Sequence, residues 1–121
     1  MMKATTTLCS LLLLSSLLLL LLPREATATV NCAVVAAKAA PCLSFVTGKV
    51  PGPPAACCGG LQQLARQAVT VADRRATCHC LENSVKRFSG VQDRLLSQIP
   101  TACHIKLSFP VSLNTNCDRI N

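Results

Sequence analysis

Two cysteine motifs near the middle of the chain contain the residues best suited to do chemistry. Cys57 and Cys58 are adjacent. Cys78 and Cys80 flank His79. Adjacent cysteines almost never bond to each other, because one extended peptide unit holds their side chains apart. If Cys78 and Cys80 lie on one helix, a rotation of about 100° per residue sends them to nearly opposite sides. We therefore expect these sulfurs to reach separate, distant partners.

The first 28 residues have the form of a secretory signal peptide. A positive start at Lys3 precedes a leucine-rich run at 8–22, and Ala26-Thr27-Ala28 has the small-x-small form of a signal-peptidase site. A transmembrane anchor is the alternative, but a span needs about 20 apolar residues. The run has only 15 positions. We expect residues 1–28 to be a signal peptide and residues 29–121 to form one small secreted domain.

Removal of this leader changes the cysteine count and the charge. Cys9 is lost, so nine cysteines become eight, an even number suited to disulfides in an oxidising compartment. Two of the twelve basic residues and one of the five acidic residues are also lost, which leaves a net charge of +6. The remaining 93 residues contain no Trp or Tyr and three Phe. Small cores seldom supply more than about 3–5 kcal/mol, and four disulfides of about 2–4 kcal/mol each would add the missing stability.

The spacing of apolar residues predicts an all-α domain of four helices. The first covers 32–46, where Pro41 should kink or split it. The second follows the loop at 48–54, with Pro53 or Pro54 in its first turn. Gly59 and Gly60 weaken it by roughly 1 kcal/mol each, which indicates close packing or ligand access. Its apolar positions are Cys57, Leu61, Leu64, Ala65 and Ala68.

The third and fourth helices begin at predicted capping boxes. Thr70-Val71-Ala72-Asp73 precedes the third helix, which places Leu81 and Val85 on its apolar face. Ser89-Gly90-Val91-Gln92 should open a short fourth helix that ends or distorts at Pro100. Residues 104–121 show no helical period. We expect them to form an extended tail over the helices.

The complete cysteine frame resembles that of the plant type 1 non-specific lipid transfer proteins. Spacing alone allows 105 pairings of eight cysteines. The polar His79 inside the CxC motif favours type 1 over type 2, in which the partners of this motif are exchanged. The resemblance implies the disulfides Cys32–Cys80, Cys42–Cys57, Cys58–Cys103 and Cys78–Cys117. It also implies a four-helix disulfide-stapled shell around an apolar tunnel, closed on one side by the tail.

Two further segments support this resemblance. Thr70 to Arg74 looks like the family's T-x-x-D-R segment, whose arginine approaches the lipid head group. Ser108 to Ser112 falls on the family's P-Y-x-I-S segment, but here Ser108 replaces Pro and Phe109 replaces Tyr. Phe45 also stands where a Tyr is usual, so the aromatic bulk is kept and the hydroxyls are lost. The lipid-binding residues expected from the resemblance and the apolar stripes are Arg74, Phe109, Val111, Leu61, Leu81 and Phe45.

Other kinds of site fit the sequence less well. Cysteines with His79 and His104 could suggest zinc, but an even cysteine set in a secreted chain pairs with itself, so we expect no metal and no cofactor. No nucleophile-elbow motif appears and every cysteine of 29–121 should be bonded, so we expect no enzyme. No basic and aromatic array indicates nucleic acid.

Two functions remain open. The first is a monomeric extracellular carrier, in the apoplast or cell wall, of fatty acids, lysolipids or phospholipids. It would transfer lipid between membranes or to the cell surface, and could act in defence or cuticle formation. Its positive charge would draw it to anionic membrane surfaces. The second is a cationic antimicrobial or hydrolase-inhibitor module with the same cysteine frame and no lipid cargo.

Overall fold

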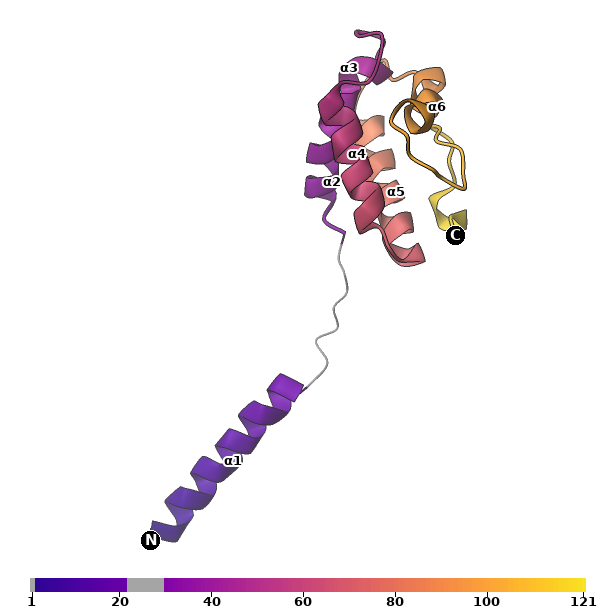
Figure 1. Cartoon of the computed structure of the whole chain (residues 1–121). Helices are drawn as coiled ribbons and strands as arrows, with labels where there is room; N and C mark the ends of the chain where they lie inside the picture. The colour runs from indigo at the N-terminus through magenta and orange to yellow at the C-terminus, as the bar shows by residue number, and fades with distance from the viewer. Residues whose placement is uncertain (1, 22–29) are drawn as a thin grey trace.

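The computed structural model describes residues 2–21 and 30–121 (Figure 1). The first of these ranges holds a single helix, α1 (Met2–Leu21), in which Cys9 is exposed and free. Within the two described ranges, no helix is both long enough and apolar enough to cross a membrane. The expected cleavage site at 26–28 lies outside the described residues, so the signal peptide stays a prediction.

Residues 30–121 are helical, and this range contains no strand. The all-α prediction is therefore confirmed, and the four expected helices appear as four bodies in the expected order. Their elements are α2 (Cys32–Ala39), η1 (Ala40–Cys42), α3 (Leu43–Val46), α4 (Ala55–Gln67), α5 (Val71–Lys86), α6 (Asp93–Ala102) and η2 (Cys117–Arg119). Helix α2 packs against both α4 and α5, and α6 lies with the tail on the other side of these helices (Figure 1).

The first body is divided at Pro41, as the sequence predicts. Asn31 begins α2, and its Oδ1 accepts a hydrogen bond of 2.9 Å from the backbone N–H of Ala33. Pro41 lacks a backbone donor and crowds the preceding turn, so the α-helix gives way to the 3-10 turn η1. The chain then resumes as the short helix α3, which packs against α6.

The starts of α4 and α5 differ in how they are capped. Thr70 Oγ1 accepts a hydrogen bond of 3.0 Å from the backbone N–H of Asp73, so the predicted cap of α5 is confirmed. The prediction for α4 is wrong by about one position, because Pro54 is the capping residue and precedes the first turn. Pro54 has an extended backbone and still helps to start the helix. The Pro54 carbonyl accepts from the N–H groups of Cys57 and Cys58 at 2.9 and 3.2 Å.

The predicted capping box of the fourth helix is wrong. Helix α6 begins at Asp93 with Gln92 as its capping residue, and no side chain caps it. The segment before it is held elsewhere, because the Gln92 N–H donates to the Val46 carbonyl at 2.8 Å and Gly90 adopts a φ of +85°. Pro100 also does not end α6, which continues to Ala102. The Pro100 carbonyl accepts a 2.8 Å hydrogen bond from the N–H of Ile105, at the beginning of the tail.

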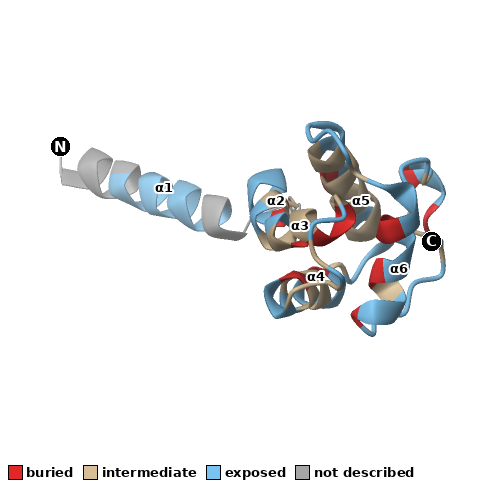
Figure 2. Cartoon of the chain, turned by 90° about the horizontal axis from the view of Figure 1, so that it is seen from above, coloured by how far each residue is buried: buried red, intermediate tan, exposed pale blue. Residues whose placement is uncertain are grey.

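Four disulfides join the helices, and they are the four pairs that the resemblance implies. Cys32–Cys80 joins α2 to α5, Cys42–Cys57 joins η1 to α4, Cys58–Cys103 joins α4 to the residue after α6, and Cys78–Cys117 joins α5 to η2. The largest packed core surrounds two of these bonds, between α3, α4 and α6. Figure 2 shows how few positions are fully buried elsewhere in the domain.

The tail covers the helices without regular structure until η2. The Leu113 N–H donates to Asp93 Oδ1 at 2.7 Å, which fastens the tail to the start of α6. Arg75 Nε donates to the Ile120 carbonyl at 2.8 Å, which fastens its end to α5. Ile120 is itself buried. These contacts hold residues 104–121 as a wall opposite α4 and α5.

Candidate functional site

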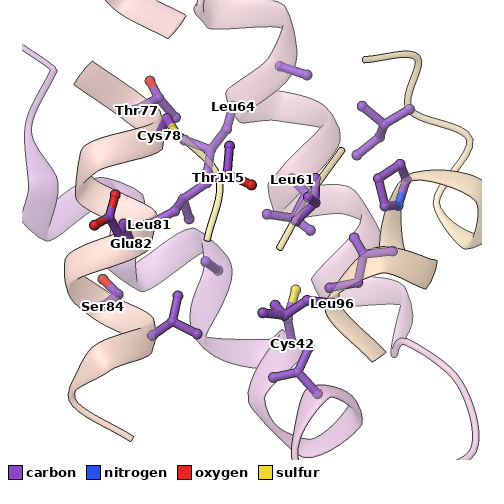
Figure 3. Close-up of a pocket in the computed structure, with 18 of the residues that line it drawn as sticks. Cys42, Leu61, Leu64, Thr77, Cys78, Leu81, Glu82, Ser84, Leu96 and Thr115 are labelled. Carbon is purple, nitrogen blue, oxygen red and sulfur yellow. The ribbon is translucent and has the colours of Figure 1, made fainter. Parts of the chain in front are cut away.

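A cavity of about 710 Å³ lies between the helices and the tail. Its walls come from α2, η1, α3, α4, α5, α6 and the tail, and most of the lining residues are apolar. In Figure 3 Leu61 and Leu64 of α4 and Leu81 of α5 border the same space. This volume falls in the usual range of about 300–1,000 Å³ for small-molecule sites. The cavity is therefore suited to an apolar ligand of considerable length.

Small side chains leave this space open. Four alanines of α2 and η1, which are Ala36, Ala37, Ala39 and Ala40, line the cavity. Ala65 and Ala68, at the end of α4, line it as well. Leucine at these positions would extend into the same volume. None of these alanines was predicted to be a site residue, although their three- and four-residue spacing on two helices was a usable signal.

Five of the six predicted lipid-binding residues line the cavity. Leu61, Leu81, Arg74, Phe109 and Val111 come from two helices and the tail, and all are partly exposed. Phe45 does not line the cavity: the residue is 3 % exposed and belongs to the packed core beside Leu95 and Ile99. The η1 turn at Pro41 redirects the chain, so α3 packs against α6 and carries Phe45 away from the cavity.

Arg74 holds the ends of two helices together as well as lining the cavity. Its Nη1 donates to the carbonyls of Val69 at 3.0 Å and Ala68 at 3.5 Å, just after α4. Its Nε is buried and has no hydrogen-bond partner in the structure. Buried donors are nearly always satisfied, so an unpartnered N–H on a residue that lines the cavity is unusual. The sequence did not predict that Arg74 also joins the end of α4 to the start of α5.

Glu82 is a polar residue in the cavity wall that was not predicted from the sequence. It lies two turns beyond Arg74 on α5, and its Oε1 accepts a 2.6 Å hydrogen bond from Lys86 Nζ. This hydrogen bond and the positive charge of Lys86 lower the pKa of Glu82 below its usual value of 4.5. The eight-residue separation from Arg74 places both on one face of the helix, and that spacing was readable from the sequence.

The described residues contain one group with the composition of a metal site. His79, Glu82 and Cys117 place their ligand atoms within 4.8 Å of one another. Cys117 is bonded to Cys78, however, so its sulfur cannot act as a thiolate ligand. His79 Nε2 lies 2.8 Å from Asp118 Oδ1, and both residues are exposed. The group is therefore explained by a surface hydrogen bond between His79 and Asp118 beside the Cys78–Cys117 disulfide.

The cavity and its frame define a class of protein: a small, disulfide-stabilised helical shell that encloses an apolar ligand. Comparison with known proteins agrees with this class. The sequence model described as "Protease inhibitor/seed storage/LTP family" matches residues 32–117. Non-specific lipid-transfer protein C, a cotyledon-specific isoform from Ricinus communis, is 53 % identical over 94 residues, which are 78 % of this chain and 80 % of that protein.

Solved structures give the same result. The wheat non-specific transfer protein, complexed with two phospholipid molecules, has a TM-score of 0.71 and 34 % identity, covering 75 % of this chain and all of that one. Barley non-specific lipid transfer protein 1, complexed with lysophosphatidylcholine, also has a TM-score of 0.71, with 33 % identity over 76 % of this chain and all of that one. The chain belongs to the protease inhibitor/seed storage/LTP family, and within it to the plant type 1 non-specific lipid-transfer proteins.

Proposed function

We propose that this protein is a secreted plant lipid carrier that binds fatty acids, lysolipids or phospholipids in its cavity. It would transfer them between membranes or to the cell surface, in the apoplast or cell wall. The observation that carries the proposal is the largely apolar cavity of about 710 Å³ inside a disulfide-bonded shell. The phospholipid and lysophosphatidylcholine complexes of its wheat and barley relatives support the same ligand class.

The apolar chain supplies the affinity. Each methylene moved out of water contributes about 0.8 kcal/mol, so a palmitoyl chain gains roughly 10 kcal/mol before the costs of association. Dispersion contacts with leucine and alanine side chains respond to length and volume. Binding of this kind accepts many lipids with similar chains, and this breadth suits a carrier.

Arg74 is the proposed polar contact for the head group. Its side chain lines the cavity, and its buried Nε–H has no protein partner. A carboxylate or phosphate oxygen would accept a charge-assisted hydrogen bond from this group. Phe109 also lines the cavity but has no hydroxyl to donate. Leu61, Leu81 and Val111 would contact the acyl chain.

Secretion, a monomeric state and contact with anionic membranes belong to the same proposal. The eight cysteines of 29–121 form four disulfides, which fits an oxidising compartment reached through the leader at 1–28. The net charge of +6 after loss of the leader would attract anionic lipid surfaces. We expect no catalysis. A cargo-free antimicrobial or inhibitor module has less support, because it has no use for so large an apolar cavity.

Displacement of a fluorescent fatty acid by unlabelled lipids tests the carrier function directly. We expect palmitate and lysophosphatidylcholine to displace the probe and a short-chain acid such as butyrate to fail. Failure of every long-chain lipid to displace it, or of the probe to bind at all, would favour the cargo-free alternative.

Calorimetric titration tests the head-group contact. Arg74→Ala should weaken palmitate binding by about 1.5–3 kcal/mol and leave the binding of an alkane of the same length unchanged. Phe109→Tyr should add a donor and tighten palmitate by about 0.5–1.5 kcal/mol. Equal effects on palmitate and the alkane would show that these residues shape the cavity and do not contact the head group.

A further inference from the structure

A second, shallower hollow of about 360 Å³ lies on the outer surface beside the cavity. Three residues, Ala65, Ile105 and Lys106, line both spaces, so the hollow and the cavity share a wall. The hollow's remaining lining residues are Gln62, Arg66 and His104. The hollow is therefore next to the cavity, and a ligand that leaves the cavity on this side would bring its polar part to the hollow.

The positions of the hollow's walls are fixed by the fold. Gln62 and Arg66 are four residues apart on α4, so they lie on one face of that helix. Gln62 Nε2 donates to the Cys103 carbonyl at 2.8 Å, beside the Cys58–Cys103 disulfide. The Ile105 N–H is bound to the Pro100 carbonyl at 2.8 Å. These contacts hold residues 103–106 against α4 and keep the two walls together.

The hollow is cationic and has no compensating acid. Of the four acids in the described range 30–121, none lines it. Glu82 bonds to Lys86, Asp118 to His79 and Asp93 to the Leu113 backbone. Arg66 donates through Nε to the Gln62 carbonyl at 3.4 Å, which leaves both Nη groups without a bond among the described residues.

We propose that this hollow binds the phosphate of an acyl phospholipid whose chain lies in the cavity. The proposal rests on the carrier function and adds a head-group site separate from Arg74. A guanidinium fork and an ammonium group, supplied by Arg66 and Lys106, match the several oxygens of a phosphate better than the two of a carboxylate. Lys106 lines both spaces, so it would contact the ligand near the point where the phosphate joins the apolar chain. The site makes this protein favour phosphate-bearing lipids over neutral lipids with the same chain.

Three ligands separate the parts of this proposal: 1-palmitoyl lysophosphatidic acid, 1-monopalmitoylglycerol and glycerol 3-phosphate. The first carries chain and phosphate, the second only the chain, and the third only the phosphate. The test variant is Arg66→Gln with Lys106→Gln. The matched control is Lys49→Gln with Arg94→Gln, which removes the same charge from two exposed residues that line neither space.

We expect the test variant to bind lysophosphatidic acid about tenfold more weakly at low salt, because two charge-assisted contacts are lost at an exposed site. Monopalmitoylglycerol should bind equally to all three proteins, which also shows that the variants are folded. The control should change lysophosphatidic acid binding by less than about twofold. The tenfold loss should shrink in 0.5 M salt, where exposed charges are screened.

Three outcomes would overturn the proposal: unchanged lysophosphatidic acid binding in the test variant, an equal loss for the neutral lipid, or an equal loss in the control. Glycerol 3-phosphate binding as tightly as lysophosphatidic acid would assign the hollow to free phosphate and not to a lipid. If the unaltered protein bound monopalmitoylglycerol and lysophosphatidic acid with equal affinity, the proposed phosphate site would be wrong and the carrier function would stand. If it bound neither lipid, the carrier function itself would be wrong.

Discussion

The two halves of the domain use apolar side chains in opposite ways. Between α3, α4 and α6, Phe45 and Leu95 pack around the Cys42–Cys57 and Cys58–Cys103 disulfides, are less than 10 % exposed and do not line the cavity. Leu96 and Ile99 lie at the boundary, because they belong to this core and also line the cavity. Between α4, α5 and the tail, Leu61, Leu81, Phe109 and Val111 surround a cavity and remain partly exposed. The first half contributes stability, and the second keeps a space for ligand.

This difference shows how a small domain can be both stable and hollow. A protein interior normally packs like an organic crystal, and unfilled volume costs free energy. Here the packed half and four covalent links hold the helices, so the cavity walls need not fill their own centre. Substitutions in the packed half should act on stability, and substitutions in the cavity half should act on ligand binding.

Reduction of the disulfides should have the largest effect, because it removes the frame that both halves share. Each bond contributes about 2–4 kcal/mol, and the four together are comparable to the whole stability of a small domain. We expect reduced protein to lose its helical circular dichroism and its affinity for palmitate together. Reduced protein that still bound palmitate would show that packing alone maintains the cavity. Oxidised protein carried through the same dilution is the control.

The two phenylalanines Phe45 and Phe109 distinguish the halves directly. Phe45→Ala should lower the free energy of unfolding by about 3–5 kcal/mol, because it opens a void in the packed core. Phe109→Ala should lower it by about 1 kcal/mol and should weaken palmitate binding more than Phe45→Ala does. Urea unfolding and calorimetric titration measure the two effects. Equal losses of stability would contradict the proposed division.

Two adjacent glycines in α4 give a matched pair for the contact between α2 and α4. A Cβ at Gly60 would lie 2.2 Å from the Lys38 carbonyl oxygen, whereas a Cβ at Gly59 meets nothing within 4 Å. Gly60→Ala should therefore destabilise by about 1–3 kcal/mol. Gly59→Ala should stabilise by up to about 1 kcal/mol, because alanine favours a helix. Thermal unfolding of the two variants compares them, and a stabilising Gly60→Ala would rule out the close approach.

The smallest effect should come from the Glu82–Lys86 pair on the cavity wall. Lys86 lowers the pKa of Glu82, so ionised Glu82 adds a small stability that is complete above its usual value of 4.5 and is lost as the pH falls through the lowered value. Glu82→Gln should slightly lower the melting temperature at pH 7. The difference between the two proteins should vanish once the pH is low enough to protonate Glu82 in the folded protein. A difference that persists there would assign the effect to packing.

Many helix boundaries could be predicted from the sequence because they depend on local chemistry. The position of Pro41 divides the first helix whatever surrounds it, and Thr70 caps α5 through a bond within its own turn. The failed capping box at Ser89 shows the limit of such reasoning. The residues after it are bound by a backbone contact between Gln92 and Val46, which are 46 positions apart in the chain and adjacent only after folding.

The sequence by itself determined the all-α class, the number and order of the helical bodies in 30–121, and five of the residues that line the cavity. Helical periodicity, proline and cysteine spacing specify these features before any tertiary contact forms. The tertiary structure decided which apolar residues pack and which remain around a space. Phe45 and Phe109 are equally apolar in the sequence, and only the turn at η1 and the attachment of the tail to Asp93 place one in the core and the other at the cavity.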